Sequence, residues 1–235
     1  MVHLNSEPLV SIIIPVFNEL KTIGTLLEKV EQSSRSFQRE IIVVDDGSTD
    51  GTSQFLSSLT DPFQILLRDR NQGKGAALRD GFSHSSGEIL LTQDGDLEYD
   101  PSDYPTLLEP ILTGTADVVF GSRFLKLRPG SIHYRSHYYG NRLLTMLTNL
   151  LTDLEISDME TGYKVFRRSL LERMDLQEDR FGFEPEFTMK IARMPGINVC
   201  EVPINYQGRS VLEGKKIKWK DGVGAIWQLF KYRYF

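Results

Sequence analysis

The sequence has one cysteine, Cys200, and only four histidines in 235 residues. A single cysteine excludes an internal disulfide framework and indicates a reducing compartment, and the scattered histidines offer no zinc-site spacing. No basic segment followed by an apolar one opens the chain, and no run of about 18 apolar residues occurs, so we expect neither a secretory signal nor a membrane-spanning helix. These absences predict a cytoplasmic protein.

The composition is that of a soluble globular protein, with 40% hydrophobic and 25% charged residues. The length suits one large α/β domain or two small ones. Because no repeat or convincing linker divides the chain, we expect a single domain over 1–235. Residues 1–120 hold 8 Lys and Arg against 19 Asp and Glu, a net charge of −11, whereas residues 121–235 carry +6. This division suits a cation-binding half and an anion-binding half, although chance clustering of surface charge explains it more simply.

Apolar stretches of strand length alternate with segments of helical spacing. Strands separated by helices predict right-handed crossovers and a mostly parallel, Rossmann-like sheet flanked by helices, the α/β class. The predicted strands are 9–17, 40–46, 63–69, 87–96, 116–123, 163–168 and 198–206, and the predicted helices are 20–33, 49–59, 73–85, 135–154 and 184–194.

Ligand-type residues follow the ends of the first four predicted strands, at 15–19, 45–48, 71–75 and 94–98. Each turn alone is ordinary, because Asp, Asn and Gly are common turn residues. In open α/β sheets, however, ligands bind outside the carboxyl ends of the strands. Four such turns at one sheet edge therefore predict a binding site.

Two of these turns contain closely spaced carboxylates. The turn "VVDDGSTDGT" starts with EF-hand spacing, but Ser57 stands where the loop needs Glu and a strand precedes it, so we exclude calcium. In "QDGDLEYDP", Asp94, Asp96 and Glu98 alternate along the chain and supply the hard oxygen ligands that suit Mg²⁺ or Mn²⁺. A solvated acidic turn is the alternative, and the strand before this turn favours a metal site.

The turn "NQGKGAA" places Lys74 between two glycines at the start of a predicted helix. Backbone N–H groups and the helix dipole favour an anion there. Neither the P-loop spacing nor the GxGxxG pattern is present. The turn therefore predicts an anion contact, with a plain helix start as the alternative.

Together these motifs resemble the inverting glycosyltransferases of family 2, which have the GT-A fold. The stretches that carry the resemblance are "IIIPVFNE", "VVDDGSTDGT", "NQGKGAA", "QDGDLEYDP" and "GSRF". Three later stretches, "DMETGYKVFRR", "RFGFEPE" and "EVPINYQGR", are similar to the dolichyl-phosphate mannose synthase-like branch, which glycosylates polyprenyl phosphates. The resemblance covers about residues 9–220. It implies a nucleotide-sugar and metal half over about 9–120 and an acceptor half over about 121–220.

The resemblance implies a metal-dependent transfer of one sugar from a UDP- or GDP-sugar to a polyprenyl (dolichyl or undecaprenyl) phosphate. Asp94, Asp96 and Glu98 would hold Mg²⁺ or Mn²⁺ against the donor diphosphate, and Asp96 would count as catalytic, since the metal neutralises charge on the leaving group. Asp46 would read the base. The implied nucleotide-sugar-binding residues are Pro15, Phe17, Glu19, Asp46, Lys74, Asp94, Arg209 and Lys216.

The acceptor residues implied by the resemblance are cationic. Arg123 and Arg135 match the positions that contact the acceptor phosphate, and Arg209 with Lys216 would cover phosphates as a mobile loop. A phosphate acceptor is largely ionised at neutral pH, because its second pKa is about 6, so a general base is optional. A hydroxyl acceptor would need a base, and Asp158 or Glu184 would be the candidate.

Some features leave alternatives open. Glu98 stands where the branch often has Gln, and "GRSVLEGKK" lacks the Ser of the usual loop pattern, which leaves Lys216 ambiguous. The aromatic and basic tail, 219–235, suits peripheral contact with the cytoplasmic membrane face, or a helix packed on the domain. Transfer to a soluble hydroxyl acceptor and a non-catalytic nucleotide-binding module are the rival functions. We expect no nucleic-acid partner.

Overall fold

The computed structural model describes residues 7–126, 135–209 and 219–234. Within them the strands form one seven-stranded sheet in the order β3-β2-β1-β4-β6-β5-β7. The bounds are β1 (Val10–Val16), β2 (Arg39–Asp45), β3 (Phe63–Leu67), β4 (Ile89–Thr92), β5 (Val118–Ser122), β6 (Lys164–Arg167) and β7 (Val199–Pro203). The α/β class and the mostly parallel sheet predicted from the sequence are confirmed.

One strand runs against the others. β6 pairs antiparallel with both β4 and β5, whereas β1–β2, β1–β4, β2–β3 and β5–β7 are parallel. The insertion of β6 between β4 and β5 separates two strands that are consecutive in the first half of the chain. The alternation of strands and helices predicted neither this insertion nor its direction, because both depend on contacts with the second half.

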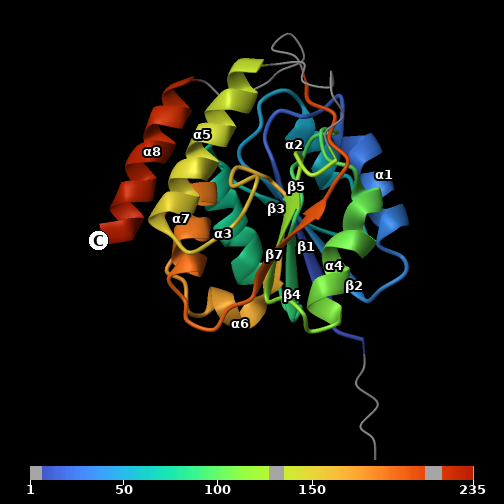
Figure 1. The fold of residues 1–235 in the computed structure, drawn as a ribbon. Helices are drawn as coiled ribbons and strands as arrows, with labels where there is room; N and C mark the ends of the chain where they lie inside the picture. Colours follow the sequence, from blue (N-terminus) through green and yellow to red (C-terminus); the bar gives the residue numbers. More distant parts are fainter. Residues whose placement is uncertain (1–6, 127–134, 210–218, 235) are drawn as a thin grey trace, which may run out of the picture.

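Helices cover both faces of the sheet (Figure 1). They are α1 (Ile23–Ser33), α2 (Thr52–Ser57), α3 (Lys74–His84), a 3-10 turn η1 (Pro101–Asp103), α4 (Tyr104–Leu112), α5 (Arg135–Leu151), α6 (Arg168–Leu171), α7 (Phe183–Ala192) and α8 (Trp219–Tyr234). In Figure 1, α1 and α4 lie on one side of the sheet and α3 and α7 on the other, with α5 and α8 outside α7.

The interior strand β1 is buried on both faces. Ile12 and Ile14 pack into the hydrophobic cluster on the α1 and α4 side, and Ile13 packs into the cluster on the α3 and α7 side. Such burial explains why the sequence here is a continuous apolar run and does not alternate with polar residues. The two covered faces leave the carboxyl ends of the parallel strands as the open edge.

The C-terminal helix α8 packs on the domain and also exposes apolar side chains. Ala225, Leu229 and Tyr232 lie in a third hydrophobic cluster with residues of α5 and α7. Trp227 and Phe230 point outward and are 67% and 41% exposed. The sequence left a packed helix and a membrane-contacting tail as alternatives, and the two faces of α8 are compatible with both. Among the described residues, no helix is both long enough and apolar enough to cross a bilayer.

Candidate functional site

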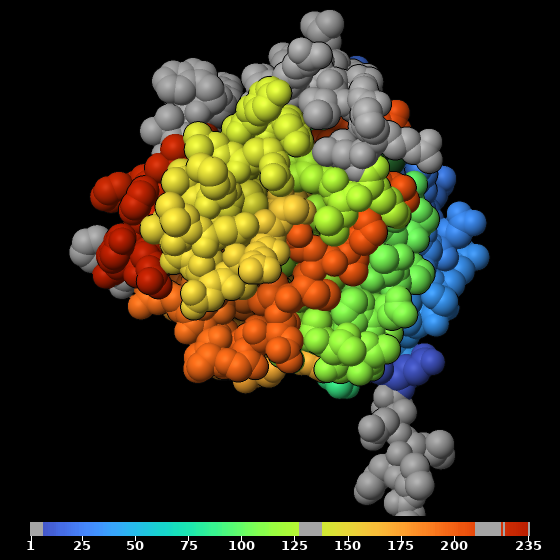
Figure 2. Space-filling model, viewed as in Figure 1, coloured from blue at the N-terminus to red at the C-terminus, as the bar shows by residue number. Residues whose placement is uncertain are grey.

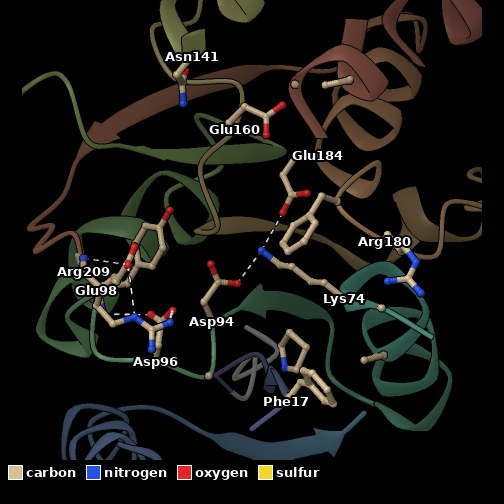
Figure 3. Close-up of a pocket in the computed structure, with 18 of the residues that line it drawn as sticks. Phe17, Lys74, Asp94, Asp96, Glu98, Asn141, Glu160, Arg180, Glu184 and Arg209 are labelled. Atoms are coloured by element: carbon tan, nitrogen blue, oxygen red, sulfur yellow. Dashed lines mark hydrogen bonds and ion pairs between the residues drawn. The ribbon is translucent and has the colours of Figure 1, made fainter. Parts of the chain in front are cut away.

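A cavity of about 1210 Å³ opens at the carboxyl ends of the parallel strands. The turns after β1, β2, β3 and β4 meet there, as the four ligand-type turns predicted. The predicted site residues that line it are Pro15, Phe17, Glu19, Asp46, Lys74, Asp94, Asp96, Glu98, Arg123, Glu184 and Arg209. Phe17 lies at one end of the cavity and Asn141 of α5 at the other (Figure 3).

At the Phe17 end, Asp46 holds the Gly-rich turn in place. Its carboxylate accepts hydrogen bonds from the backbone N–H groups of Gln72 (3.0 Å) and Gly73 (2.7 Å) and from Arg68 (2.8 Å). Gly73 has a φ of 115°, a region that favours glycine. Asp46 therefore shapes this end of the cavity, and its contact with a nucleotide base stays a prediction.

Lys74 begins α3 and joins two carboxylates from distant parts of the chain. Its ammonium lies 2.6 Å from Asp94 Oδ1 and 2.7 Å from Glu184 Oε1 (Figure 3). Burial alone would lower the pKa of Lys74, but the attraction of Asp94 and Glu184 raises it above its ordinary value. The ammonium is therefore charged at neutral pH and lies at the centre of the cavity wall.

Arg209 occupies the acidic side of the cavity. Its guanidinium lies 2.9 Å from Glu19, 2.5 Å from Asp96 and 3.4 Å from Glu98. Burial and the Asp94 charge raise the pKa of Asp96 to about 7, against the opposing effect of Arg209. Asp94, Asp96 and Glu98 thus lie side by side, with Asp94 paired to Lys74 and the other two carboxylates sharing Arg209.

The metal ligands expected from the sequence are not gathered into a preformed cluster. Over the ranges that the structure describes, no group of three or more His, Cys, Asp or Glu side chains is arranged to hold a metal ion. The donor set nevertheless fits Mg²⁺ or Mn²⁺, because it consists of carboxylates beside a guanidinium in the position of a cation. Among the described residues, seven acidic and four basic side chains line the cavity, an acidic excess that a divalent cation would partly offset.

Asp158 lies behind Arg123 and does not line the cavity. Its fully buried carboxylate accepts hydrogen bonds from Nε and Nη2 of Arg123, both at 2.7 Å, and from Asn141 Nδ2 at 3.1 Å. Arg123 itself lines the cavity and is paired in a fixed orientation. This geometry suits a carboxylate that positions Arg123. It does not suit a base for a hydroxyl acceptor, because the Asp158 carboxylate does not reach the cavity.

Two cationic side chains that the sequence predicted to contact phosphates lie outside the described part of the structure. Lys216 falls within 210–218, and the side chain of Arg135, at the first position of α5, is also outside the described part. Their roles stay predictions.

The structure adds side chains that the motif analysis did not select. Asn141, Glu160, Arg180 and Tyr206 also line the cavity. Tyr206 donates its hydroxyl to Glu98 at 2.5 Å. Glu160 lies in the loop between Asp158, which the sequence analysis named as a candidate, and the strand β6. Its only signal was its place in "DMETGYK", which gives no indication of where a side chain points.

We expect the stability advantage of Glu160→Gln over the parent to depend on pH. Burial and the Glu184 charge raise the pKa of Glu160 from 4.5 to about 8. Between these values the native protein keeps a proton that the unfolded chain has lost, so the free energy of unfolding falls as the pH rises. Glutamine has no such penalty. The Tm advantage of Glu160→Gln should therefore grow from pH 4.5 to 8, towards an upper bound of about 4–5 kcal/mol, or roughly 8–20 °C.

Thermal unfolding at a series of pH values measures this effect. Glu155→Gln is the matched control, since Glu155 is exposed on the preceding loop, and its Tm should follow the parent's at every pH. Parallel curves for Glu160→Gln and the parent would show that the Glu160 pKa is not raised.

Comparisons with known proteins identify the family and the fold of the chain. The model of Glycosyl transferase family 2 matches residues 11–175. Glycosyltransferase AglJ of Haloferax volcanii is 31% identical over 201 residues, which is 85% of this chain and 63% of that protein. The dolichol-phosphate mannosyltransferase of Pyrococcus furiosus is 29% identical over 218 residues, 88% of this chain and 60% of that protein.

The chain matches a bacterial relative over a similar length. The undecaprenyl-phosphate 4-deoxy-4-formamido-L-arabinose transferase of Pseudomonas paraeruginosa is 31% identical over 213 residues, 88% of this chain and 60% of that protein. The chain thus spans between 60% and 63% of the length of these three relatives.

Solved structures share the fold. Glucosyl-3-phosphoglycerate synthase from Mycobacterium tuberculosis, in complex with Mn²⁺, UDP and phosphoglyceric acid, has a TM-score of 0.73 at 20% identity and covers 97% of this chain and 79% of that one. Mannosyl-3-phosphoglycerate synthase from Rubrobacter xylanophilus has a TM-score of 0.72 at 18% identity, with coverages of 96% and 72%. These likenesses identify the fold as GT-A.

Proposed function

The chain belongs to glycosyl transferase family 2, and from this premise we propose that it transfers one sugar from a UDP- or GDP-sugar to a polyprenyl phosphate at the cytoplasmic face of a membrane. The transfer inverts the anomeric carbon and uses Mg²⁺ or Mn²⁺. Relatives named as dolichol-phosphate and undecaprenyl-phosphate sugar transferases support this acceptor class.

One observation is the main support for a lipid acceptor, the distribution of exposed apolar side chains. Among the described residues, seven of the eleven most exposed large apolar side chains lie on α5 and α8. They recur every three or four residues along each helix, which places them in stripes. They are Tyr139, Leu143, Met146 and Leu150 on α5, and Trp227, Phe230 and Tyr234 on α8. We call this set the apolar stripe pair.

The apolar stripe pair is continuous with the cavity. α5 and α8 pack together through their buried faces and lie at one edge of the molecule (Figures 1 and 2). Leu143 belongs both to the α5 stripe and to the cavity lining, and Ile226 lines the cavity next to Trp227. Exposed apolar patches of this kind mark surfaces for lipid or another partner. A prenyl chain on this surface would place its phosphate at the cavity end that holds Arg123.

The donor half of the reaction follows from the other end of the cavity. Phe17 and Asp46 would enclose the nucleoside, and Lys74 would supply a cation for the diphosphate. Asp94, Asp96 and Glu98 would hold the metal, which when bound neutralises charge on the leaving nucleoside diphosphate.

In the acceptor half, Arg123 would orient the lipid phosphate, and Asp158 fixes that guanidinium from behind. A phosphate oxygen attacks the anomeric carbon while the bond between that carbon and the diphosphate oxygen breaks. Because the attacking oxygen is largely ionised at neutral pH, no proton has to be removed from it. The side chains therefore have to position and neutralise charge rather than act as a base.

Charges placed on the apolar stripe pair should release the protein from lipid. For the double variant Met146→Glu/Trp227→Glu, we expect binding to anionic vesicles to fall at least about 10-fold, because each side chain loses roughly 1.5–3 kcal/mol of apolar burial. Vesicle sedimentation measures the change. Leu112→Glu is the control, since Leu112 is 52% exposed on α4, and its binding should stay at the parent level. Equal losses for both variants would remove the stripe pair from the proposal.

The function itself is tested by supplying the substrates. The protein is incubated with Mg²⁺ or Mn²⁺, a panel of UDP- and GDP-sugars and either undecaprenyl phosphate or dolichyl phosphate in vesicles, and glycolipid is measured. We expect transfer of a single sugar that stops on chelation with EDTA. Transfer only to water-soluble glycans would overturn the lipid acceptor, and nucleotide binding without any transfer would indicate a binding module.

A further inference from the structure

Two carboxylate oxygens in the cavity wall are buried without a hydrogen-bond partner, Oε1 of Glu160 and Oε2 of Glu184. Only one other side-chain atom in the described ranges, Nε of Arg39, shares this condition. Glu184 is 4% exposed, so water does not compensate its carboxylate freely. Burying an acceptor without a partner is unfavourable, and such groups in native structures call for an explanation.

The two oxygens occupy a defined place in the cavity. Glu160 comes from the loop before β6 and Glu184 from the first turn of α7. Figure 3 shows both side chains between Asn141 at one end and the Lys74–Asp94 pair at the other. The other oxygen of Glu184 is held by Lys74 at 2.7 Å. The unpartnered oxygens therefore lie directly on the acceptor side of the residues proposed to bind the donor diphosphate.

A buried lysine supports the pair from behind. Lys164 is fully buried, and its ammonium donates a hydrogen bond to the carbonyl of Thr161. It contributes attraction to Glu160, while Glu184 repels that carboxylate. A buried ammonium close to two carboxylates offsets part of their mutual repulsion. The Lys164 ammonium thus helps to hold the oxygens of Glu160 and Glu184 in position, and Lys164 itself does not line the cavity.

From this arrangement we infer that Glu160 and Glu184 bind hydroxyl groups of the donor's glycosyl unit and select a neutral hexosyl group over an anionic uronosyl group. The inference rests on the proposed function, in which the sugar lies between the diphosphate and the acceptor. Sugar hydroxyls would supply the donors that the two oxygens lack. A sugar carboxylate would bring a second negative charge beside the Glu184 carboxylate and lose affinity through repulsion.

The test compares neutral, deoxygenated and anionic donors. For the full-chain protein with polyprenyl phosphate, kcat/KM is measured for the accepted hexosyl donor, its monodeoxy analogues and the matching uronosyl donor. We expect Glu160→Ala to lower kcat/KM for the hexosyl donor by about 10- to 100-fold, because a buried sugar hydroxyl loses its hydrogen-bond partner. One monodeoxy analogue should be similarly poor with the parent and should lose no more than about 3-fold further in Glu160→Ala.

Two variants separate recognition from folding. Glu184→Gln keeps the shape and one acceptor oxygen but removes the charge, so it should narrow the parent's preference for hexosyl over uronosyl donors by about 10-fold. Glu155→Gln, on the exposed part of the loop that carries Glu160, should leave the preference unchanged. An equal loss on every donor, or a parent that prefers the uronosyl donor, would overturn the inference.

The outcome stays separate from that of the proposed function. Calorimetric titration of hexosyl and monodeoxyhexosyl donors needs no acceptor. A parent that binds these donors with different affinities but transfers to no polyprenyl phosphate contradicts the acceptor and supports the hydroxyl contacts. A parent that transfers to lipid while Glu160→Ala binds all donors like the parent contradicts the hydroxyl contacts alone.

Discussion

Replacing Asp96 with alanine is expected to lower kcat for sugar transfer by about 10²- to 10⁴-fold, the range that corresponds to several kcal/mol of lost charge stabilisation at a metal site. Asp96 lies between Asp94 and Glu98 and is the carboxylate closest to the Arg209 guanidinium. Without it, the divalent cation would lose a ligand at the point where the diphosphate leaves. Steady-state kinetics over a range of Mg²⁺ and Mn²⁺ concentrations measure the loss.

The fold should survive this substitution. Arg209 keeps its ion pairs with Glu19 and Glu98, and the repulsion between Asp96 and Asp94 disappears. We therefore expect a Tm equal to or above the parent's, which separates a catalytic loss from unfolding. Asp153→Ala is the control, because Asp153 is exposed on the loop after α5, and it should retain full activity. Parent-like kcat in Asp96→Ala would exclude Asp96 as a metal ligand.

The positions of the strand ends could be predicted from the sequence because they depend on local residue patterns. Buried parallel strands require apolar runs, and the turns at their carboxyl ends converge once the strands are parallel. Lys74 and Asp94 lie 20 positions apart in the sequence, yet their predicted strand ends placed them at one edge, and they form an ion pair of 2.6 Å. The aromatic and basic composition of the tail left membrane contact and packing on the domain as alternatives, and α8 has one packed face and one exposed face.

The remaining features depend on long-range packing. β6 enters the sheet antiparallel and carries Glu160 to the cavity wall through the loop before it. Arg209 reaches Glu19 across 190 positions of sequence because the chain after β7 returns over the β4 turn, where Tyr206 pairs with Tyr99. No periodicity or spacing encodes such returns. For the same reason the motif "DMETGYK" identified Asp158 as a candidate but did not show that it faces Arg123 and away from the cavity.

The pair of Arg123 and Asp158 carries the second large prediction. Asp158 is fully buried and Arg123 is 15% exposed, so removing one partner leaves the other charge without compensation. We expect Asp158→Ala to lower the free energy of unfolding by about 3–5 kcal/mol, the typical cost of breaking a buried ion pair. For a chain of this length, that corresponds to a Tm lower by roughly 6–20 °C. Thermal and urea unfolding measure the effect.

A double-mutant cycle distinguishes two causes of the lower stability of Asp158→Ala, the unpaired charge of Arg123 and the loss of side-chain packing. If the uncompensated guanidinium causes the instability, Arg123→Met/Asp158→Ala should be more stable than Asp158→Ala alone, and the coupling should reach about 1–3 kcal/mol. Arg123→Met alone should also raise KM for the lipid phosphate while leaving KM for the donor near the parent value, because Asp158 joins Arg123 to Asn141 at the proposed acceptor end of the cavity. Additive losses of stability in the double variant would show that the two side chains act independently, and Asp158 would then lose its role in positioning Arg123.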